Sequence, residues 1–443
     1  MLSARRYHIY SGTLGKTRRG RSLLFALVLA NVAATAVAQE YLTLPIDDTA
    51  RSNRAVAQQC LRDPAAYAAN KAKFDDYFVK YHFPAMTRTE PDKIGELGKL
   101  RDELFKLFLW KTTNAGLQGD LSNSAFIEMG KIVSAQNPPC HPAARYNAIL
   151  IIGLLDDQYS PDGRQPPKPY AKATKALTGV VDSAITSNRF PPAVILGALI
   201  GLERHAQLRD SLAPEAMSAM QAALLKLVMH DEPIQEMDRG AYAWLRLRAA
   251  SALARLGTVG DKNAVHDAIV KLAVTNKSLD DRCAAVALLE RLNYKDVKLD
   301  DAGTAEPMFA LARDIAAAED KRAQDFQELG ATGGGAFPGQ GGFGPGGGAV
   351  FDPNAYPRRH VLARLTDLRT GLMKVKPALP AETQTTVDAL LAGINPVITS
   401  ASSKDTVDLR LAESIRSMAE AVNKAVPGAA KPEADKAKEN AVF

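Results

Sequence analysis

Aromatic residues are scarce in this sequence of 443 residues, where they make up 6% of the chain and only two are tryptophan. Enzymes that cleave polysaccharides need a sugar-binding groove beside a pair of carboxylates. So few aromatic side chains argue against such a groove. The remaining composition, 46% hydrophobic and 23% charged, is ordinary for a globular protein of two or three domains.

Acidic residues are absent from the first 38 positions, which hold six Lys or Arg residues. With those six set aside, 49 of the 55 Lys and Arg residues remain, against 49 Asp and Glu, so the formal charge of +6 belongs to this leader. A nucleic-acid-binding protein would carry its cations on a folded domain. The charge distribution therefore predicts no nucleic acid among the partners.

The same leader, residues 1–38, predicts a secretory signal peptide. Its cations precede an apolar run from Leu23 to Val37, and Ala36 and Ala38 supply the small-residue pattern that signal peptidase reads before Gln39. The alternative is an uncleaved anchor, but the run is shorter than the roughly 20 residues that span a bilayer. No later run is longer. We therefore expect an exported protein, periplasmic or extracellular, with no stable membrane insertion after cleavage.

Cysteine is also rare, with three residues in the chain. In an oxidising compartment two of them can pair and one must remain over. Cys283 falls inside a predicted helix, where a buried thiol behaves as a small hydrophobic side chain. Cys60 and Cys140 lie beside predicted loops and are the candidate disulfide pair. Cys140 and the following His resemble the end of a haem-attachment motif, but Asn137 stands where its first thiol belongs.

Motifs of catalysis and cofactor binding are missing as well. The sequence has no H-E-x-x-H, no G-x-S-x-G and no zinc-like spacing of Cys and His. Gly339, Gly341 and Gly344 match G-x-G-x-x-G, but that fingerprint works only between a strand and a helix. We therefore expect no catalytic residue, no metal ligand and no cofactor. The six histidines after the leader are expected to be exposed or locally hydrogen-bonded.

What the sequence does contain is helical periodicity, clearest from Leu245 to Leu272. Apolar residues recur there at three and four positions and predict two helices joined by a tight turn. Gly257 suits the end of the first helix, and Asp261 is a candidate N-cap for the second. The first stripe contains Leu245, Ala249, Ala252, Leu253 and Leu256, with Arg248, Ser251 and Arg255 opposite, and the second contains Val265, Ala268, Ile269 and Leu272.

This stretch resembles the HEAT-like repeat, whose helix reads roughly V-R-x-x-A-A-x-A-L-G-x-L-G-D. The matching residues, with Leu in place of Val and Ala in place of the inner Gly, are Leu245, Arg246, Ala249, Ala250, Ala252, Leu253, Ala254, Leu256 and Gly257. The resemblance implies an all-α protein built as an α-solenoid of armadillo type. Two helices alone cannot bury both stripes, so the pair needs stacked neighbours.

A shorter frame, R-x-x-A-x-x-x-[IL]-x-x-L, recurs along the chain at intervals of 36 to 54 residues. Another apolar helix is expected after each copy, and Arg291 occupies the position of Arg255. The frame arginines, Arg145, Arg246 and Arg282, are expected to be solvated or paired within the chain. The alternative is that they form a row on the surface, a ladder that binds an acidic partner. The copies are Arg145, Ala148, Ile152 and Leu155; Arg246, Ala249, Leu253 and Leu256; Arg282, Ala285, Leu289 and Leu292; and a weaker one with Pro192, Ile195, Leu199 and Leu202.

The regions on either side of the repeats are predicted from composition and periodicity. Before them we expect helices over 63–81 and 93–112, the latter ended by Gly116 and Gly119, and a third that starts near Asp120 or Ser122. A Gly-rich linker follows the repeats. The predicted parts are a signal peptide (1–38), N-terminal helices (39–141), a HEAT-like solenoid (142–329), the linker (330–352), a C-terminal helical segment or bundle (353–426) and a disordered tail (427–443).

The predicted function follows from this architecture, because helical arrays usually present extended interaction surfaces. We expect an exported, non-catalytic module that binds or scaffolds a protein or another envelope macromolecule. One alternative is an α/α-toroid enzyme that acts on polysaccharide. Another is a structural envelope component in which the linker joins the repeat body to a C-terminal anchor.

Overall fold

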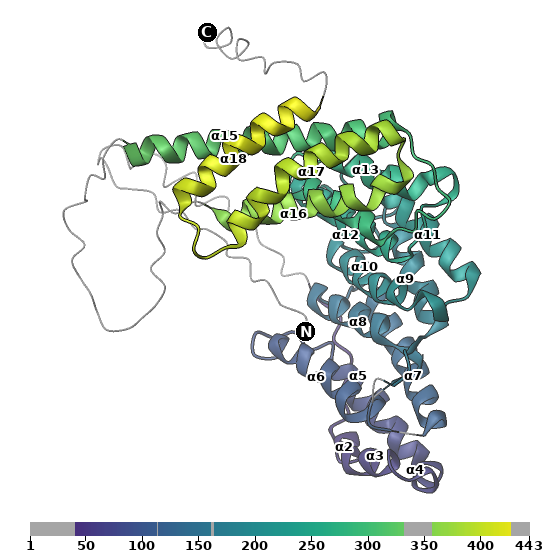
Figure 1. Cartoon of the computed structure of the whole chain (residues 1–443). Helices are drawn as coiled ribbons and strands as arrows, with labels where there is room; N and C mark the ends of the chain where they lie inside the picture. Colours follow the sequence, from purple (N-terminus) through teal and green to yellow (C-terminus); the bar gives the residue numbers. More distant parts are fainter. Residues whose placement is uncertain (1–39, 113, 161–163, 332–356, 427–443) are drawn as a thin grey trace, which may run out of the picture. The chain divides into compact units, whose positions relative to one another are not determined.

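Helices make up nearly all of the regular structure, which confirms the all-α prediction (Figure 1). The computed structural model describes residues 40–112, 114–160, 164–331 and 357–426, so the predicted signal peptide, most of the Gly-rich linker and the tail lie outside the described residues. Two short strands, β1 (Asp156–Gln158) and β2 (Lys168–Pro169), pair antiparallel. None of the described helices is long and apolar enough to cross a membrane.

From Leu42 onward the described residues form one compact unit, and the packing described below lies within it. Its N-terminal helices agree with the predicted ranges in part. Residues 63–81 contain α4 and all but the last residue of the π-helical turn η1, and Asp63 caps α4 by accepting from the Ala65 N–H at 2.8 Å. The elements are α2 (Asp48–Arg51), α3 (Arg54–Cys60), α4 (Pro64–Asp76), η1 (Tyr77–His82), α5 (Phe83–Ala85), η2 (Ile94–Glu96), α6 (Leu97–Glu103), η3 (Leu104–Leu109) and α7 (Ala115–Ser134).

The start of α7 differs from the prediction, which placed it near Asp120 or Ser122. The side chain of Asn114 accepts hydrogen bonds from the N–H groups of Gly116 and Leu117, at 3.0 and 3.2 Å, and so caps the helix earlier. Gly116 and Gly119 therefore lie inside α7 and do not end the preceding helix. A glycine inside a helix costs only about 1 kcal/mol relative to alanine, which a good cap offsets.

The central helices lie in two rows (Figure 1). In the first row α8 packs on α10, α10 on α12 and α12 on α14, and in the second α9 packs on α11, α11 on α13 and α13 on α15. The first row is α8 (Pro142–Leu154), α10 (Pro192–Gln207), α12 (Arg239–Arg255) and α14 (Leu279–Leu288). The second is α9 (Ala171–Ser183), α11 (Pro214–Met229), α13 (Ala264–Thr275) and α15 (Glu306–Ala331), with the short turns η4 (Arg209–Ser211), η5 (Asp261–Asn263), η6 (Leu289–Arg291) and η7 (Asp301–Ala305) between helices.

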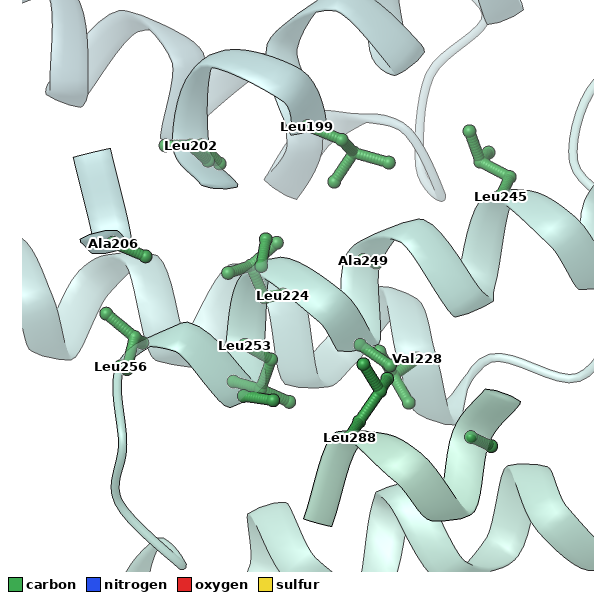
Figure 2. Packing of buried hydrophobic residues seen from close by; sticks show 14 of the residues in the cluster. Leu199, Leu202, Ala206, Leu224, Val228, Leu245, Ala249, Leu253, Leu256 and Leu288 are labelled. Carbon is green, nitrogen blue, oxygen red and sulfur yellow. The ribbon is translucent and has the colours of Figure 1, made fainter. Parts of the chain in front are cut away.

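The apolar residues of the predicted frame are buried in every copy. Leu253 and Leu289, which hold the same frame position, are both fully buried, and so is Leu199 of the weaker copy. Figure 2 shows this packing around α12, with residues of α10, α11 and α14 gathered near Leu253. The remaining apolar frame residues, also buried, are Ala148, Ile152, Leu155, Ile195, Leu202, Ala249, Leu256, Ala285 and Leu292.

The turn after α12 confirms the prediction that Gly257 suits the end of this helix. The prediction that Asp261 caps the next helix is wrong. Gly257 has a φ of 76°, which favours glycine at the end of a helix. Asp261 lies in η5, and the N-cap of α13 is Asn263, whose side chain makes no capping bond. The carbonyl of Val259 already accepts from the Val265 N–H at 2.9 Å, so this donor of the first turn needs no carboxylate.

The pairing of helices also differs in detail from the expected hairpin of α12 with α13. Each frame helix packs more extensively on the helix before it, α8 on α7, α10 on α9, α12 on α11 and α14 on α13, than on the helix after it. The tightly packed pairs therefore begin one helix earlier than the frame suggested.

Three further helices lie within the predicted C-terminal helical segment (353–426): α16 (Arg358–Val375), α17 (Ala381–Ser402) and α18 (Asp408–Ala425), with the short turn η8 (Lys376–Ala378). They do not stand apart, because α16 packs on α14 and α18 packs on α15 and α17. Gly371 of α16 meets Val286 of α14 so closely that an added Cβ would overlap the Val286 Cγ1 atom. Arg364 adds ion pairs with Asp280 at 2.6 Å and Glu319 at 2.7 Å.

Candidate functional site

The frame arginines do not form a surface ladder, because each binds within the chain. In all three, the Nε–H donates to a backbone carbonyl in the last turn of the preceding helix, where carbonyls have no partner inside the helix. The side chains of Arg145 and Arg246 are accordingly buried. The three bonds join Arg145 to Val133 of α7 (3.0 Å), Arg246 to Val228 of α11 (2.8 Å) and Arg282 to Ala273 of α13 (2.6 Å).

The cysteines are free thiols in the structure, so the bridge between Cys60 and Cys140 is not formed in it. All three are buried, and burial raises the pKa of each thiol, that of Cys283 to about 12. A thiol with a raised pKa is a weak nucleophile, since the thiolate is the reactive form. These residues therefore act as small core side chains.

Polar groups from three helical elements meet beside α12, at a place that the sequence did not indicate. Arg248, Ser251 and Arg255 share one face of α12, because they are spaced by three and four residues. Glu203 of α10 reaches them from one side and Arg291 of η6 from the other. We call Arg248, Arg255 and Arg291, with Glu203 between them, the arginine cluster.

Glu203 is the centre of this cluster. One of its carboxylate oxygens accepts from the Arg248 Nη2 atom at 2.6 Å, and the other accepts from the Ser251 hydroxyl at 2.8 Å. Arg291 donates to the same hydroxyl at 2.8 Å. The Arg255 Nε atom lies 3.9 Å from Glu203, which is too far for a hydrogen bond.

The charges of the arginine cluster do not balance. Three guanidinium groups face Glu203, with Glu290 as a second carboxylate near Arg291, and burial followed by the nearby Arg255 lowers the pKa of Arg291. The Arg255 Nε–H is buried and has no hydrogen-bond partner, although the side chain as a whole is 37% exposed. Leaving a buried donor unsatisfied costs about 1 to 3 kcal/mol. An additional oxyanion at this position would supply both a charge and an acceptor.

An exposed tryptophan lies beside the arginine cluster. Trp244 lies one turn before Arg248 on α12 and is 45% exposed. Tryptophan and arginine together are the residues that most often dominate binding at protein interfaces. Helix α6 packs on α8, and α16 packs on α14 and on η6, which carries Arg291. Neither α6 nor α16 packs extensively on α10 or α12.

The sequence pattern placed Arg248, Ser251 and Arg255 on the side of α12 opposite its apolar stripe but did not predict the cluster. The sequence did contain one indication of the cluster, since Arg291 repeats the frame position of Arg255. Stacked neighbouring frame helices would place these two guanidinium groups near each other. The position of Glu203 gave no such signal, since the weaker copy of the frame does not fix which face of α10 meets α12.

Three histidines of the described chain, His82, His205 and His266, are buried. His205 bonds Thr174 at 3.0 Å and the Gly153 carbonyl at 3.2 Å, and since a carbonyl only accepts, its Nε2 atom carries the proton. Burial lowers the pKa of His205 to about 3. In the part of the chain that the structure describes, no three His, Cys, Asp or Glu side chains gather as a metal site.

Comparisons of this chain with protein-family models, with curated proteins and with solved structures found no match.

Proposed function

We propose that this chain is an exported, non-catalytic α-solenoid of HEAT-like helical pairs, which binds an acidic segment of a partner protein. Two rows of stacked helices, with apolar frame residues buried in every copy, support the array. The arginine that joins a frame helix to the end of the helix before it recurs three times, as expected of a repeated unit. The basic, apolar leader supports export.

The observation that carries the binding proposal is the charge imbalance of the arginine cluster, in which three guanidiniums share Glu203. A carboxylate from a partner would approach Arg255 and Arg291 and supply the missing countercharge. Guanidinium groups bind carboxylates with paired, directional hydrogen bonds. Trp244 beside them would contact the apolar part of the same segment.

In this proposal Glu203 is an internal competitor of the partner. It occupies Arg248 and Ser251 in the free protein and repels an approaching carboxylate. Replacing Glu203 by Gln removes one negative charge and keeps most of the shape. This substitution should therefore tighten the binding of an acidic ligand, whereas loss of a guanidinium should weaken it.

The test uses poly-L-glutamate as the acidic probe and Trp244 as the reporter. The chain has two tryptophans, so the Trp110→Phe variant leaves Trp244 alone. We expect a saturable change in its fluorescence that weakens as salt is added. Glu203→Gln should lower the Kd about three- to tenfold and Arg255→Gln should raise it by a similar factor. The matched control, Arg410→Gln on α18, removes the same charge from an exposed position and should change little.

Two outcomes would contradict the binding proposal. Equal effects of Arg255→Gln and Arg410→Gln would mean that the probe senses net charge only. Weaker binding in a Glu203→Gln variant that melts at the wild-type temperature would mean that Glu203 orients the arginines for the ligand and does not compete with it.

Export is tested separately, by N-terminal sequencing of the secreted protein, which should begin at Gln39.

A further inference from the structure

An apolar groove of about 520 Å³ lies between α7 and α9, with α8 as its floor. Helices α9 and α11 pack directly on each other, whereas α7 and α9 make little contact, and the groove occupies the space between them. Small residues on the facing sides create this space. They are Gly130 and Ser134 of α7 and Ala176, Gly179 and Ser183 of α9.

The wall of the groove is mainly aliphatic and aromatic, and its size falls within the roughly 300 to 1,000 Å³ typical of small-molecule sites. Ile127 is 46% exposed, which is unusual for so large an apolar side chain beside other apolar residues. The larger apolar residues that line the groove are Phe126, Ile127, Val133, Ile149, Ile152, Val180 and Phe190.

One of the side chains at the groove, that of Arg189, is cationic. Arg189 lines the groove, and the Arg189 guanidinium lies 5.2 Å from the centre of the Phe190 ring. The backbone there is held in place, because the Arg189 carbonyl accepts from Arg145 at 3.2 Å and from Gln136 at 3.1 Å. The cation is therefore attached to a fixed segment beside α7 and α8.

Arg145, which donates to the Arg189 carbonyl, differs from the other two frame arginines, Arg246 and Arg282. Arg246 pairs with Asp231 and Arg282 pairs with Asp314, both at 2.8 Å. Among the residues that the structure describes, neither Arg145 nor Arg189 forms an ion pair with a carboxylate. Burial lowers the pKa of Arg145, and the neighbouring Arg189 adds to this effect. Arg189 at the groove and Arg145 behind it thus have no acidic partner in the described chain.

We propose that the groove between α7 and α9 binds a free long-chain fatty acid, with the acyl tail along Ile127, Ile149 and Val180 and the carboxylate at Arg189. The tail would cover the exposed apolar wall, and the carboxylate would balance the two guanidiniums. This inference rests on residues separate from the arginine cluster, so either proposal can fail alone.

The head group is tested with two probes of equal chain length, laurate and dodecanol, measured by calorimetry below the concentration at which micelles form. We expect laurate to bind more tightly, and each added methylene from decanoate to myristate to lower the Kd by up to about fourfold until the groove is full. Arg189→Gln should raise the Kd of laurate about five- to tenfold and leave dodecanol unchanged. Arg410→Gln, the matched charge control, should affect neither probe.

The tail is tested by filling the groove from its own wall. An added Cβ at Gly179 meets no atom within 4 Å, so Gly179→Leu has room and should not lower the melting temperature. The leucine would occupy the space between α7 and α9 and should abolish the binding of both probes. Gly119→Leu, at an exposed position of α7 that is equally open, is the matched control and should bind both normally.

Three results would overturn the proposal. Wild-type binding by a folded Gly179→Leu variant would place the ligand elsewhere. Equal weakening of laurate and dodecanol by Arg189→Gln would show that the carboxylate is not recognised. Failure of both probes to bind the wild-type protein would mean that the groove does not accept an acyl chain.

Discussion

Helices α8 and α10 meet at a pair of glycines, and a single added methyl group there tests how closely the two helices pack. A Cβ at Gly201 would lie 2.9 Å from the Gly153 Cα atom and 2.8 Å from the Leu177 Cδ1 atom. The leucine can rotate away, but the Gly153 backbone cannot. Gly201→Ala must therefore push α10 away from α8.

Two opposing effects set the change in the free energy of unfolding of Gly201→Ala. Alanine favours a helix over glycine by about 1 kcal/mol, whereas forcing an extra carbon into a packed interface costs about 1 to 3 kcal/mol. We expect a net loss of about 1 to 2 kcal/mol in the free energy of unfolding. Gly179→Ala is the matched comparison, because its Cβ meets nothing within 4 Å and only the gain of about 0.5 to 1 kcal/mol should remain.

The assay is urea denaturation of the three proteins, together with amide exchange. A chain of this size need not unfold in one step, so exchange in α8 and α10 supplies the local measurement. Gly201→Ala should speed exchange in both helices, and Gly179→Ala should not. If Gly201→Ala stabilises the protein as much as Gly179→Ala does, the backbones of α8 and α10 are not in contact at this point.

Further measurements test other parts of the packing. Leu253→Ala should cost about 2 to 5 kcal/mol through lost burial and the cavity left behind, measured by urea denaturation. Arg246→Gln should speed amide exchange at the end of α11, whose last-turn carbonyl loses its donor. His205 stays neutral in the folded chain while the unfolded chain protonates near pH 6.5, so stability should fall as the pH drops from 7 toward 3. In His205→Gln the loss between pH 7 and 5 should be smaller by about 2 kcal/mol, and an unchanged slope would contradict the neutral assignment. A thiol reagent should find three reactive cysteines after denaturation without reductant; finding one would mean that Cys60 and Cys140 are bridged.

The helices themselves could be predicted because each buries a stripe with a period of 3.6 residues. An apolar helix follows each copy of the frame as expected, and the frame residues Leu253 and Leu289 are buried. Helix boundaries that depend on a single capping side chain were harder to predict. The start of α7 was placed too late because the side chain of Asn114 competes with those of Asp120 and Ser122 as a cap, and periodicity does not decide between them.

Neither candidate site followed from the sequence, because each depends on which faces of distant helices meet. The arginine cluster needs the face of α10 that carries Glu203 to lie against α12, 45 residues from Arg248 along the chain. The groove needs Gly130 and Gly179 to face each other across α8. A glycine leaves no apolar signal, so a space between helices is not visible in a pattern of hydrophobic residues.

The docking of the C-terminal helices has a consequence for how the chain can be divided. Helix α16 is held against α14 by close packing at Gly371 and against α14 and α15 by the ion pairs of Arg364, and α18 packs separately on α15. None of these contacts depends on the covalent connection between Ala331 and Pro357. A chain cut in that interval should therefore stay associated as a complex of two fragments. Expressed as separate polypeptides, the two parts should find each other and reconstitute the protein, with an affinity that reports the strength of this interface.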